Sequence, residues 1–237
     1  QPLEAFAKLK GYEAGDLATR LADARRKLLD ARSQRVRPHR DDKILTSWNG
    51  LMIASLASGA VVLDEPRYLR AAERAARFLL DHVRHEGVLL RRYRAGDARY
   101  PGTLEDYAFL SLGLLELYQA SGTPSWLAEA KALTHQMLER FWDPQAGGLW
   151  LRSREDTPLI VPSKEIYDGA IPSGNSIAAL VLLKLGRLPA DQPLEAYGRR
   201  LLETFAASVS RSPFSYPQLL IAWDVALGPT QEIVVAG

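Results

Sequence analysis

The chain has 237 residues, of which 47% are hydrophobic and 24% are charged, as in an ordinary globular protein. It contains no cysteine, which excludes disulfides, a thiolate nucleophile and cysteine-ligated metal sites. The net charge of +2 is too small to indicate a nucleic-acid partner, and the four histidines lack metal-site spacing, so we expect no metal and no other cofactor.

The apolar stretches and the first residue bear on location and completeness. No secretory signal opens the sequence, and the longest uncharged apolar stretch, residues 51–63, is far shorter than the roughly 20 residues of a membrane span. We therefore expect a cytoplasmic protein with no membrane partner. The chain opens with glutamine rather than methionine, so we expect it to be a piece of a larger protein.

The first half of the chain alternates surface and buried helical patterns. Residues 16–33 carry charges at helical spacing and predict an amphipathic helix. Residues 48–63 are apolar on all sides and rich in small side chains, which predicts a helix that is buried all round. Residues 67–84 are again amphipathic, with Pro66 at the first helical position. Residues 88–93 then predict a short strand.

The second half repeats this order. The predicted elements are a buried helix at 104–118, an amphipathic helix at 125–141, a strand at 149–152, a buried helix at 173–185, an amphipathic helix at 194–209, a buried helix at 214–227 and a strand-like end at 232–236. Each buried helix but the last is followed by a surface helix, so the unit is a repeated pair of inner and outer helices.

Inner helices packed side by side and ringed by outer helices make an α/α toroid. We therefore predict a mostly α fold, with short β hairpins in the loops, as a single domain over residues 1–237. A closed toroid needs six hairpins and the sequence has four buried helices, so we expect an incomplete toroid whose open flanks self-associate or lose order. Eight side chains should be almost fully buried: Leu51, Ile53, Leu56, Leu112, Leu115, Ala178, Leu182 and Leu220.

Polar and aromatic residues gather where the inner helices begin. In a toroid these starts converge at one end, and a bowl lined with carboxylates, amides and aromatic rings suits a sugar. Two carboxylates that flank a glycosidic bond can hydrolyse it. The candidate acid–base groups are Asp42, Glu105, Asp106 and Asp168. The candidate binding groups are the stacking platforms Trp48, Tyr107 and Tyr167 and the hydrogen-bonding groups Lys43, Asn49 and Asn175.

Ordinary structural roles explain several of these residues equally well. Asp106 lies three residues after Thr103 and can complete a capping box, and Glu105 suits a helix N-terminus for its charge alone. Trp48 can be a core residue. His39 is the one histidine near this rim, and a solvated loop position accounts for it.

Three blocks of this sequence, read together, resemble a known family. Residues 37–53 (RPHRDDKILTSWNGLMI) resemble the signature of the spermatogenesis-associated thioredoxin-like proteins. Residues 105–108 and 168–176 are similar to two further blocks of that family, in the same order. The resemblance implies a thioredoxin-like domain followed by a six-hairpin, glycosidase-like toroid, of which this chain would be only the toroid part.

The resemblance also bears on chemistry. The family's toroid is similar to sugar epimerases and to unsaturated-uronide hydrolases. Such epimerases use histidines in the bowl, and here only His39 lies near an inner-helix start, which disfavours epimerisation. We therefore predict a carbohydrate-active toroid. The alternative is a non-catalytic module that binds a sugar or a protein and serves the redox domain.

Overall fold

The computed structural model describes residues 2–153, 161–188 and 192–229. The chain divides into two compact units, an N-terminal unit (Gln1–Asp42) and a toroid unit (Lys43–Gly237). The sequence analysis treated residues 1–237 as one domain. The strand-like stretch at 232–236 lies outside the described residues.

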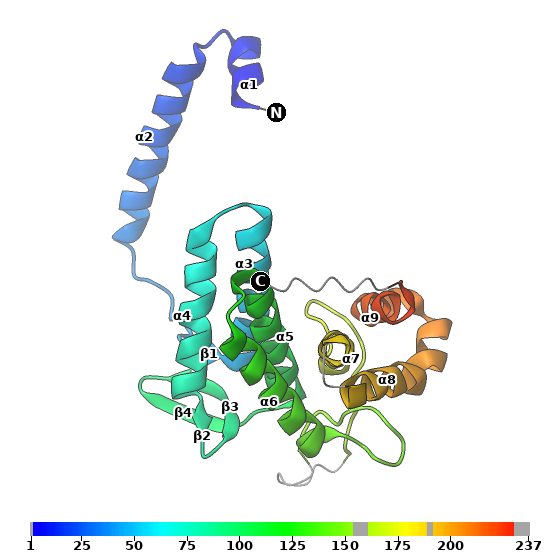
Figure 1. Cartoon of the computed structure of the whole chain (residues 1–237). Coiled ribbons are helices and arrows are strands. Elements are labelled where there is room, and N and C mark those ends of the chain that lie inside the picture. The colour runs from blue at the N-terminus through cyan, green and yellow to red at the C-terminus, as the bar shows by residue number, and fades with distance from the viewer. Residues whose placement is uncertain (1, 154–160, 189–191, 230–237) are drawn as a thin grey trace, which may run out of the picture. The chain divides into compact units, whose positions relative to one another are not determined.

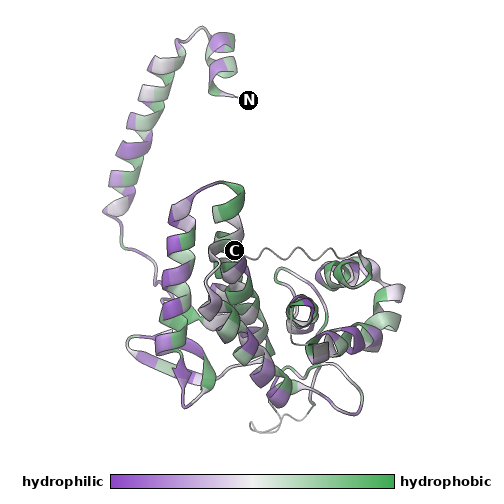
Figure 2. Cartoon of the chain, viewed as in Figure 1, coloured by the Kyte–Doolittle hydropathy of each residue, from purple (hydrophilic) through white to green (hydrophobic). Residues whose placement is uncertain are grey.

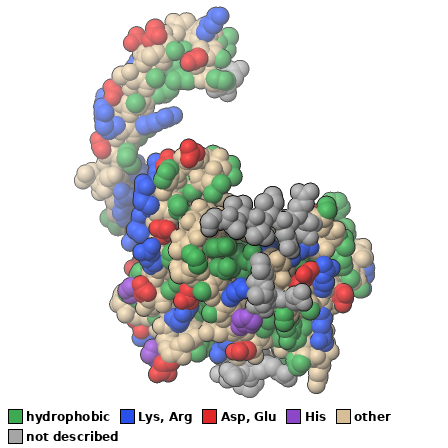
Figure 3. Space-filling model, in the orientation of Figure 1, with side chains coloured by type: hydrophobic (Ala, Val, Ile, Leu, Met, Phe, Trp, Pro, Cys, Tyr) green, Lys and Arg blue, Asp and Glu red, His purple; other side chains and the backbone are tan. Residues whose placement is uncertain are grey.

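The N-terminal unit consists of two helices, α1 (Leu3–Lys10) and α2 (Ala14–Ser33). Gly11 ends α1 in the left-handed conformation, with φ of 72°, which suits glycine because it has no β-carbon. No residue of α2 is buried, and hydrophobic side chains are visible along both helices (Figure 3). The amphipathic pattern correctly predicted α2, whereas the short α1 was not predicted.

The toroid unit is built from seven helices and four short strands within the described residues. Its elements are β1 (Ile44–Leu45), α3 (Thr46–Val62), α4 (Pro66–His82), β2 (Arg84–His85), β3 (Val88–Arg94), β4 (Asp97–Pro101), α5 (Leu104–Ser121), α6 (Pro124–Phe141), α7 (Gly174–Arg187), α8 (Gln192–Arg211), the 3₁₀ turn η1 (Pro213–Ser215) and α9 (Pro217–Leu227). Together with α2 of the N-terminal unit, these seven helices account for all eight predicted helices, with ends that differ by a few residues.

Alternate helices pack side by side and form the inner layer. Helix α3 packs on α5, α5 on α7 and α7 on α9, while α4, α6 and α8 each cover the inner helix that precedes them (Figure 1). The outer helix α4 has one hydrophilic and one hydrophobic side (Figure 2). By contrast, α5 and α7 are buried along most of their length. This arrangement is the predicted arc of an α/α toroid.

A small antiparallel sheet lies beside the start of the arc. Strand β3 pairs with β4 as a hairpin and also with β1 and β2, so β3 is central. The predicted strand at 88–93 is therefore confirmed. The predicted strand at 149–152 is wrong: only Leu149 forms an isolated bridge, with Trp142. The Asn175 amide oxygen accepts the Leu149 N–H and its amide nitrogen donates to the Leu149 carbonyl, so a side chain occupies the position on that edge where a neighbouring strand would pair.

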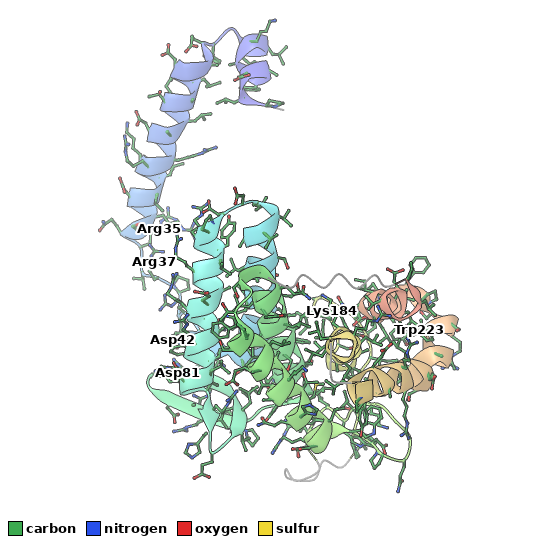
Figure 4. All side chains as sticks on the ribbon, viewed as in Figure 1. Arg35, Arg37, Asp42, Asp81, Lys184 and Trp223 are labelled. Atoms are coloured by element: carbon green, nitrogen blue, oxygen red, sulfur yellow. The ribbon has the colours of Figure 1, made fainter. Side chains whose placement is uncertain are left out.

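Glycines set the distance between the first two inner helices. A β-carbon added at Gly50 of α3 would lie 2.5 Å from the carbonyl carbon of Phe109, and one at Gly113 of α5 would lie 2.7 Å from the Gly50 oxygen. Both distances are shorter than any real contact, so the α3 and α5 backbones touch directly at these two positions. Nearer the helix C-terminal ends, Lys184 of α7 (Figure 4) donates to Glu116 of α5 at 2.5 Å.

Burial follows the position of each inner helix in the arc. Five of the eight side chains predicted to be buried are at most 8% exposed, namely Ile53, Leu112, Leu115, Ala178 and Leu182. Leu51 and Leu56 of α3 are half-buried, and Leu220 of α9 is 39% exposed, so the prediction is wrong for these three. In the described chain α5 and α7 have inner helices on both sides, while α3 and α9 stand at the ends of the arc and keep one face open.

The glycine contact predicts a sharp difference between two substitutions in α3. Gly50→Ala should lower the free energy of unfolding by about 1–3 kcal/mol, because the new methyl group overlaps the α5 backbone. Gly59→Ala meets only Tyr68 at 3.8 Å and should raise stability by up to about 1 kcal/mol through helix propensity. Urea unfolding of both variants measures this, and equal effects would contradict the close contact.

Candidate functional site

The four inner helices begin next to one another, at one end of the arc. The Ser47 N–H at the start of α3 donates to Asp106 of α5. A β-carbon at Gly174, the first residue of α7, would lie 2.8 Å from Leu104, the first residue of α5. Asp168, just before α7, accepts from the first turn of α9. The predicted convergence of inner-helix starts is therefore present, and we call this end the rim.

Asp106 joins the starts of α3 and α5. One carboxylate oxygen accepts the Ser47 N–H at 3.0 Å, and the other accepts the Thr103 N–H at 2.8 Å and the Thr103 hydroxyl at 3.1 Å, within a capping box. Burial raises the pKa of Asp106, and the Thr103 hydrogen bonds oppose that rise. Asp106 is 1% exposed, so it is better described as a helix cap than as an acid–base group.

Asp168 does the same for α7 and α9. One of its oxygens accepts the Ser173 N–H at 2.8 Å, and the other accepts the N–H groups of Gln218 at 2.9 Å and Leu219 at 3.1 Å. These backbone groups lie at helix starts, where no intrahelical partner is available. Asp168 is 8% exposed and its contacts give it a capping role, although the sequence analysis proposed it as an acid–base group.

Two of the predicted binding residues also serve the core. Asn175 is fully buried, and besides both backbone groups of Leu149 its amide binds the Glu165 carbonyl at 2.8 Å. Tyr107 is fully buried as well, its hydroxyl accepts the Leu89 N–H at 3.1 Å, and its ring packs edge-on against Phe141. Neither side chain has a surface left for a ligand.

A lysine holds the loop under Asn175 in place. Lys164 donates to the Asp143 carboxylate at 2.6 Å and to the Gly147 carbonyl at 2.5 Å, and its ammonium lies 4.3 Å from the centre of the Trp150 ring. The Lys164 hydrogen bond lowers the pKa of Asp143 to about 2. This pair fixes the turn that carries Leu149 to Asn175.

The environment of Glu105 differs from that of Asp106 and Asp168, the other predicted acid–base groups of the rim. It lies half-buried in the first turn of α5. Burial raises its pKa above the usual 4.5, the charges of Asp106 and Glu165 raise it further, and Arg91 opposes them. No hydrogen bond within the described residues contributes to this shift. A carboxyl group whose pKa is raised in this way is suited to act as a general acid.

The remaining predicted residues lie at the surface. Trp48 and Tyr167 are each 61% exposed, beside the starts of α3 and α7, and Lys43 is exposed before β1. The Asn49 amide donates to the Leu45 carbonyl at 2.8 Å within its own helix start. Asp42, which is labelled in Figure 4, is exposed and belongs to the N-terminal unit, whereas the rim belongs to the toroid unit.

The sequence analysis missed two charged residues that act on Glu105. Glu165 is exposed just before Tyr167, and Arg91 is exposed on β3; both influence the Glu105 carboxylate. Glu165 stands in the polar stretch before α7, so the signal was present, but only Asp168 of that stretch was named as an acid–base candidate. Arg91 belongs to a strand that the sequence did not connect with the inner helices.

The fold is that of sugar-active α/α toroids. An α-mannanase of glycoside hydrolase family 76 from Bacteroides thetaiotaomicron superposes with a TM-score of 0.63 at 14% identity, over 79% of this chain and 54% of the mannanase. Cellobiose 2-epimerase from Spirochaeta thermophila gives 0.59 at 20% identity, over 72% and 45%. Unsaturated glucuronyl hydrolase from Bacillus sp. GL1 gives 0.55 at 18% identity, over 73% and 50%. The chain is thus a partial α/α toroid.

Sequence comparison identifies the relatives of this toroid. Spermatogenesis-associated protein 20 from Homo sapiens is 34% identical over 246 residues, which cover 99% of this chain and 31% of that protein, and the Mus musculus protein matches equally well. These matches confirm the resemblance predicted from the sequence: the chain is homologous to one region of these proteins and spans about a third of their length. No protein-family model matches the chain.

Helix apolarity and the clustering of potential metal ligands bear on membrane and metal binding. In the described part of the chain, no helix combines the length and apolarity that crossing a membrane requires. Nor do three or more histidine, aspartate or glutamate side chains come together there as a metal site would need.

The Glu105 environment predicts a pH-dependent effect on stability. Because the folded-state pKa lies above the unfolded value, the folded protein binds more protons, and stability falls as pH rises from about 4.5 through the raised pKa. Glu105→Gln should therefore raise the free energy of unfolding at pH 7 and lose that advantage below about pH 4.5. Urea unfolding at several pH values measures this, and a difference that is constant with pH would indicate packing instead.

Proposed function

We propose that this toroid is a carbohydrate-active domain whose reaction centre is Glu105 at the rim. The observation that carries the proposal is a half-buried carboxyl group with a raised pKa at an inner-helix start, with exposed aromatic residues at the starts of the neighbouring inner helices. The fold supports it, because the toroids that superpose on this chain are named as a mannanase, an epimerase and a uronyl hydrolase.

Glycoside hydrolysis is the chemistry that suits these groups. Protonated Glu105 donates its proton to the glycosidic oxygen as the bond from that oxygen to the anomeric carbon breaks. Glu165, which is exposed and close enough to affect the Glu105 pKa, takes a proton from the water that attacks the anomeric carbon. Glu165 then releases its proton to solvent and Glu105 takes one up from solvent, so both carboxyl groups return to their starting states. Arg91 stabilises the Glu105 carboxylate after its proton has left.

The rest of the bowl, in this proposal, comes from polypeptide outside residues 1–237. The chain covers about half of each superposed toroid and 31% of its curated relatives. We propose that the full-length polypeptide completes the toroid and also carries the thioredoxin-like domain that the sequence resemblance implies. The exposed end of α3, with Val61, Val62 and Leu63, and the exposed Ile221 and Leu227 of α9 are the faces to be covered.

A second candidate is a non-catalytic module that binds a sugar or a protein. One observation favours it: both carboxylate oxygens of Asp106 and of Asp168 accept hydrogen bonds from backbone N–H groups. Glu105 then has only Glu165 as a carboxylate partner in the described toroid unit. The two candidates differ in whether a bound sugar is turned over.

Activity of the full-length polypeptide distinguishes them. We expect cleavage of α-mannan oligosaccharides or unsaturated glucuronyl disaccharides, and a fall in rate of at least about 100-fold in Glu105→Gln with binding retained. Glu203→Gln, on the exposed side of α8, is the matched control and should keep the wild-type rate. Binding without turnover in the wild type would favour the module, and no binding of any sugar would reject the carbohydrate proposal.

The open faces predict the behaviour of residues 1–237 expressed alone. This chain should self-associate, because apolar side chains of α3 and α9 face solvent. Ile221→Lys should reduce the self-association, whereas Ala207→Lys on the exposed side of α8 should not. Sedimentation velocity measures both, and a monodisperse wild-type monomer would contradict the prediction.

A further inference from the structure

Large aromatic side chains are exposed at only four places in the described toroid unit, and each is in the first turn of an inner helix or a few residues before one. Trp48 is 61% exposed in the first turn of α3, and Tyr100 is 60% exposed in β4, shortly before α5. Tyr167 is 61% exposed before α7, and Phe214 is 98% exposed in the turn before α9. The outer helices and the far ends of the inner helices carry none among the described residues.

Backbone hydrogen bonds tie three of these aromatics to the rim. Trp48 follows Ser47, whose N–H donates to Asp106. The Asp168 N–H donates to the Ser215 carbonyl at 3.0 Å. Tyr167 directly precedes Asp168 and Phe214 directly precedes Ser215, so this hydrogen bond joins the backbone segments that carry the two aromatics. The three rings are thus attached to the same carboxylate-capped helix starts, one per helix.

Tyr100 is held in an unfavourable backbone conformation. Its φ is 65°, a left-handed value that is uncommon for a bulky residue, and it precedes Pro101, which disfavours helical backbone in the residue before it. The Arg92 guanidinium lies 5.2 Å from the centre of its ring. Strained residues persist where the surrounding structure holds them for a function, and this strain presents an aromatic ring to solvent.

We propose that Trp48, Tyr100, Tyr167 and Phe214 are stacking platforms for successive rings of an oligosaccharide that runs along the rim. The apolar faces of pyranose rings stack on aromatic side chains, which explains why large rings are left in water here. Packed helices lie about 8–10 Å apart, so platforms on neighbouring helix starts are too far apart to share one sugar ring. The ligand is therefore a chain of several sugars.

This inference rests on the proposed function, because it names the substrate class of the same rim. It adds Tyr100 and Phe214, which no reaction step uses, as residues that set the length of the bound chain. Glu105 lies in the first turn of α5, between the start of α3 with Trp48 and the start of α7 with Tyr167. The acid group would then act within the bound chain rather than at its outermost ring.

Affinity as a function of oligosaccharide length tests the proposal in the full-length polypeptide. The probes are glucose to cellohexaose and mannose to α-mannohexaose, titrated by calorimetry. In the wild type, affinity for one of these series should rise with each added ring up to about the fourth. Tyr100→Ala and Phe214→Ala should each weaken binding of the hexamer by about threefold to tenfold and leave the single sugar unaffected.

Two control variants separate stacking from folding. Tyr100→Phe keeps the ring and should retain wild-type affinity for the hexamer. Tyr12→Ala removes an aromatic of similar exposure, 50%, from the N-terminal unit and should change nothing. Circular dichroism confirms that each variant is folded before it is titrated.

The possible failures are distinguishable. Binding of a single sugar with no gain from longer chains, or hexamer binding that Tyr100→Ala and Phe214→Ala leave intact, would overturn this inference and leave the proposed function standing. No binding of any of these probes would overturn this inference, and if an unsaturated glucuronyl disaccharide also failed to bind, the proposed function would fall with it. Self-association that Tyr100→Ala or Phe214→Ala abolishes would make the four rings a protein interface and overturn the inference.

Discussion

The start of a helix leaves backbone N–H groups without a partner, and in this protein two carboxylates satisfy such groups on two helices at once. Asp106 serves α3 and α5, and Asp168 serves α7 and α9. A buried carboxylate without such donors would be strongly unfavourable, so each one is stable only while both of its helices are in place. The side-by-side order of the inner helices therefore depends on these two contacts.

The caps also distinguish Asp106 and Asp168 from Glu105, the carboxyl group proposed as the reaction centre. Asp106 and Asp168 have donors on both oxygens, whereas the Glu105 carboxyl group is half-buried and influenced mainly by burial and by the charges around it. Adjacent residues of one helix thus have different environments, because the Asp106 side chain turns back to the helix start and the Glu105 side chain has no such contact. If the proposed activity is found, substituting either cap would lower it by displacing a helix, so such a loss would be no sign of catalysis.

Sequence patterns predicted the helices well because their causes are local. Charge spacing in α4 and the unbroken apolar runs of α5 and α7 are visible within single segments. The capping box of Asp106 was visible for the same reason, since Thr103 lies three residues away. By contrast, Asp168 binds N–H groups 50 and 51 residues away, and Asn175 binds a loop 26 residues away. No local sequence pattern predicts such distant hydrogen-bond partners.

Errors in predicted burial had a similar cause. Leu56 and Leu220 lie on helices that are apolar all round, and the sequence alone does not tell which of these helices stands at the end of the arc. Exposure of Tyr167 and burial of Tyr107 likewise depend on neighbours from other segments. Composition near a helix start was informative about the kind of residues at the rim, but not about which of them reach solvent.

The order of packing has a consequence for how the chain is made. Inner helices contact the inner helices next to them in sequence, α3 with α5, α5 with α7 and α7 with α9, as in a solenoid. Each hairpin that leaves the ribosome can therefore dock on the one already folded, with no need to wait for distant segments. The last hairpin made would meet the first only when the ring closes. Until then the nascent arc exposes an apolar edge at each step, and chaperones would have most reason to bind it there.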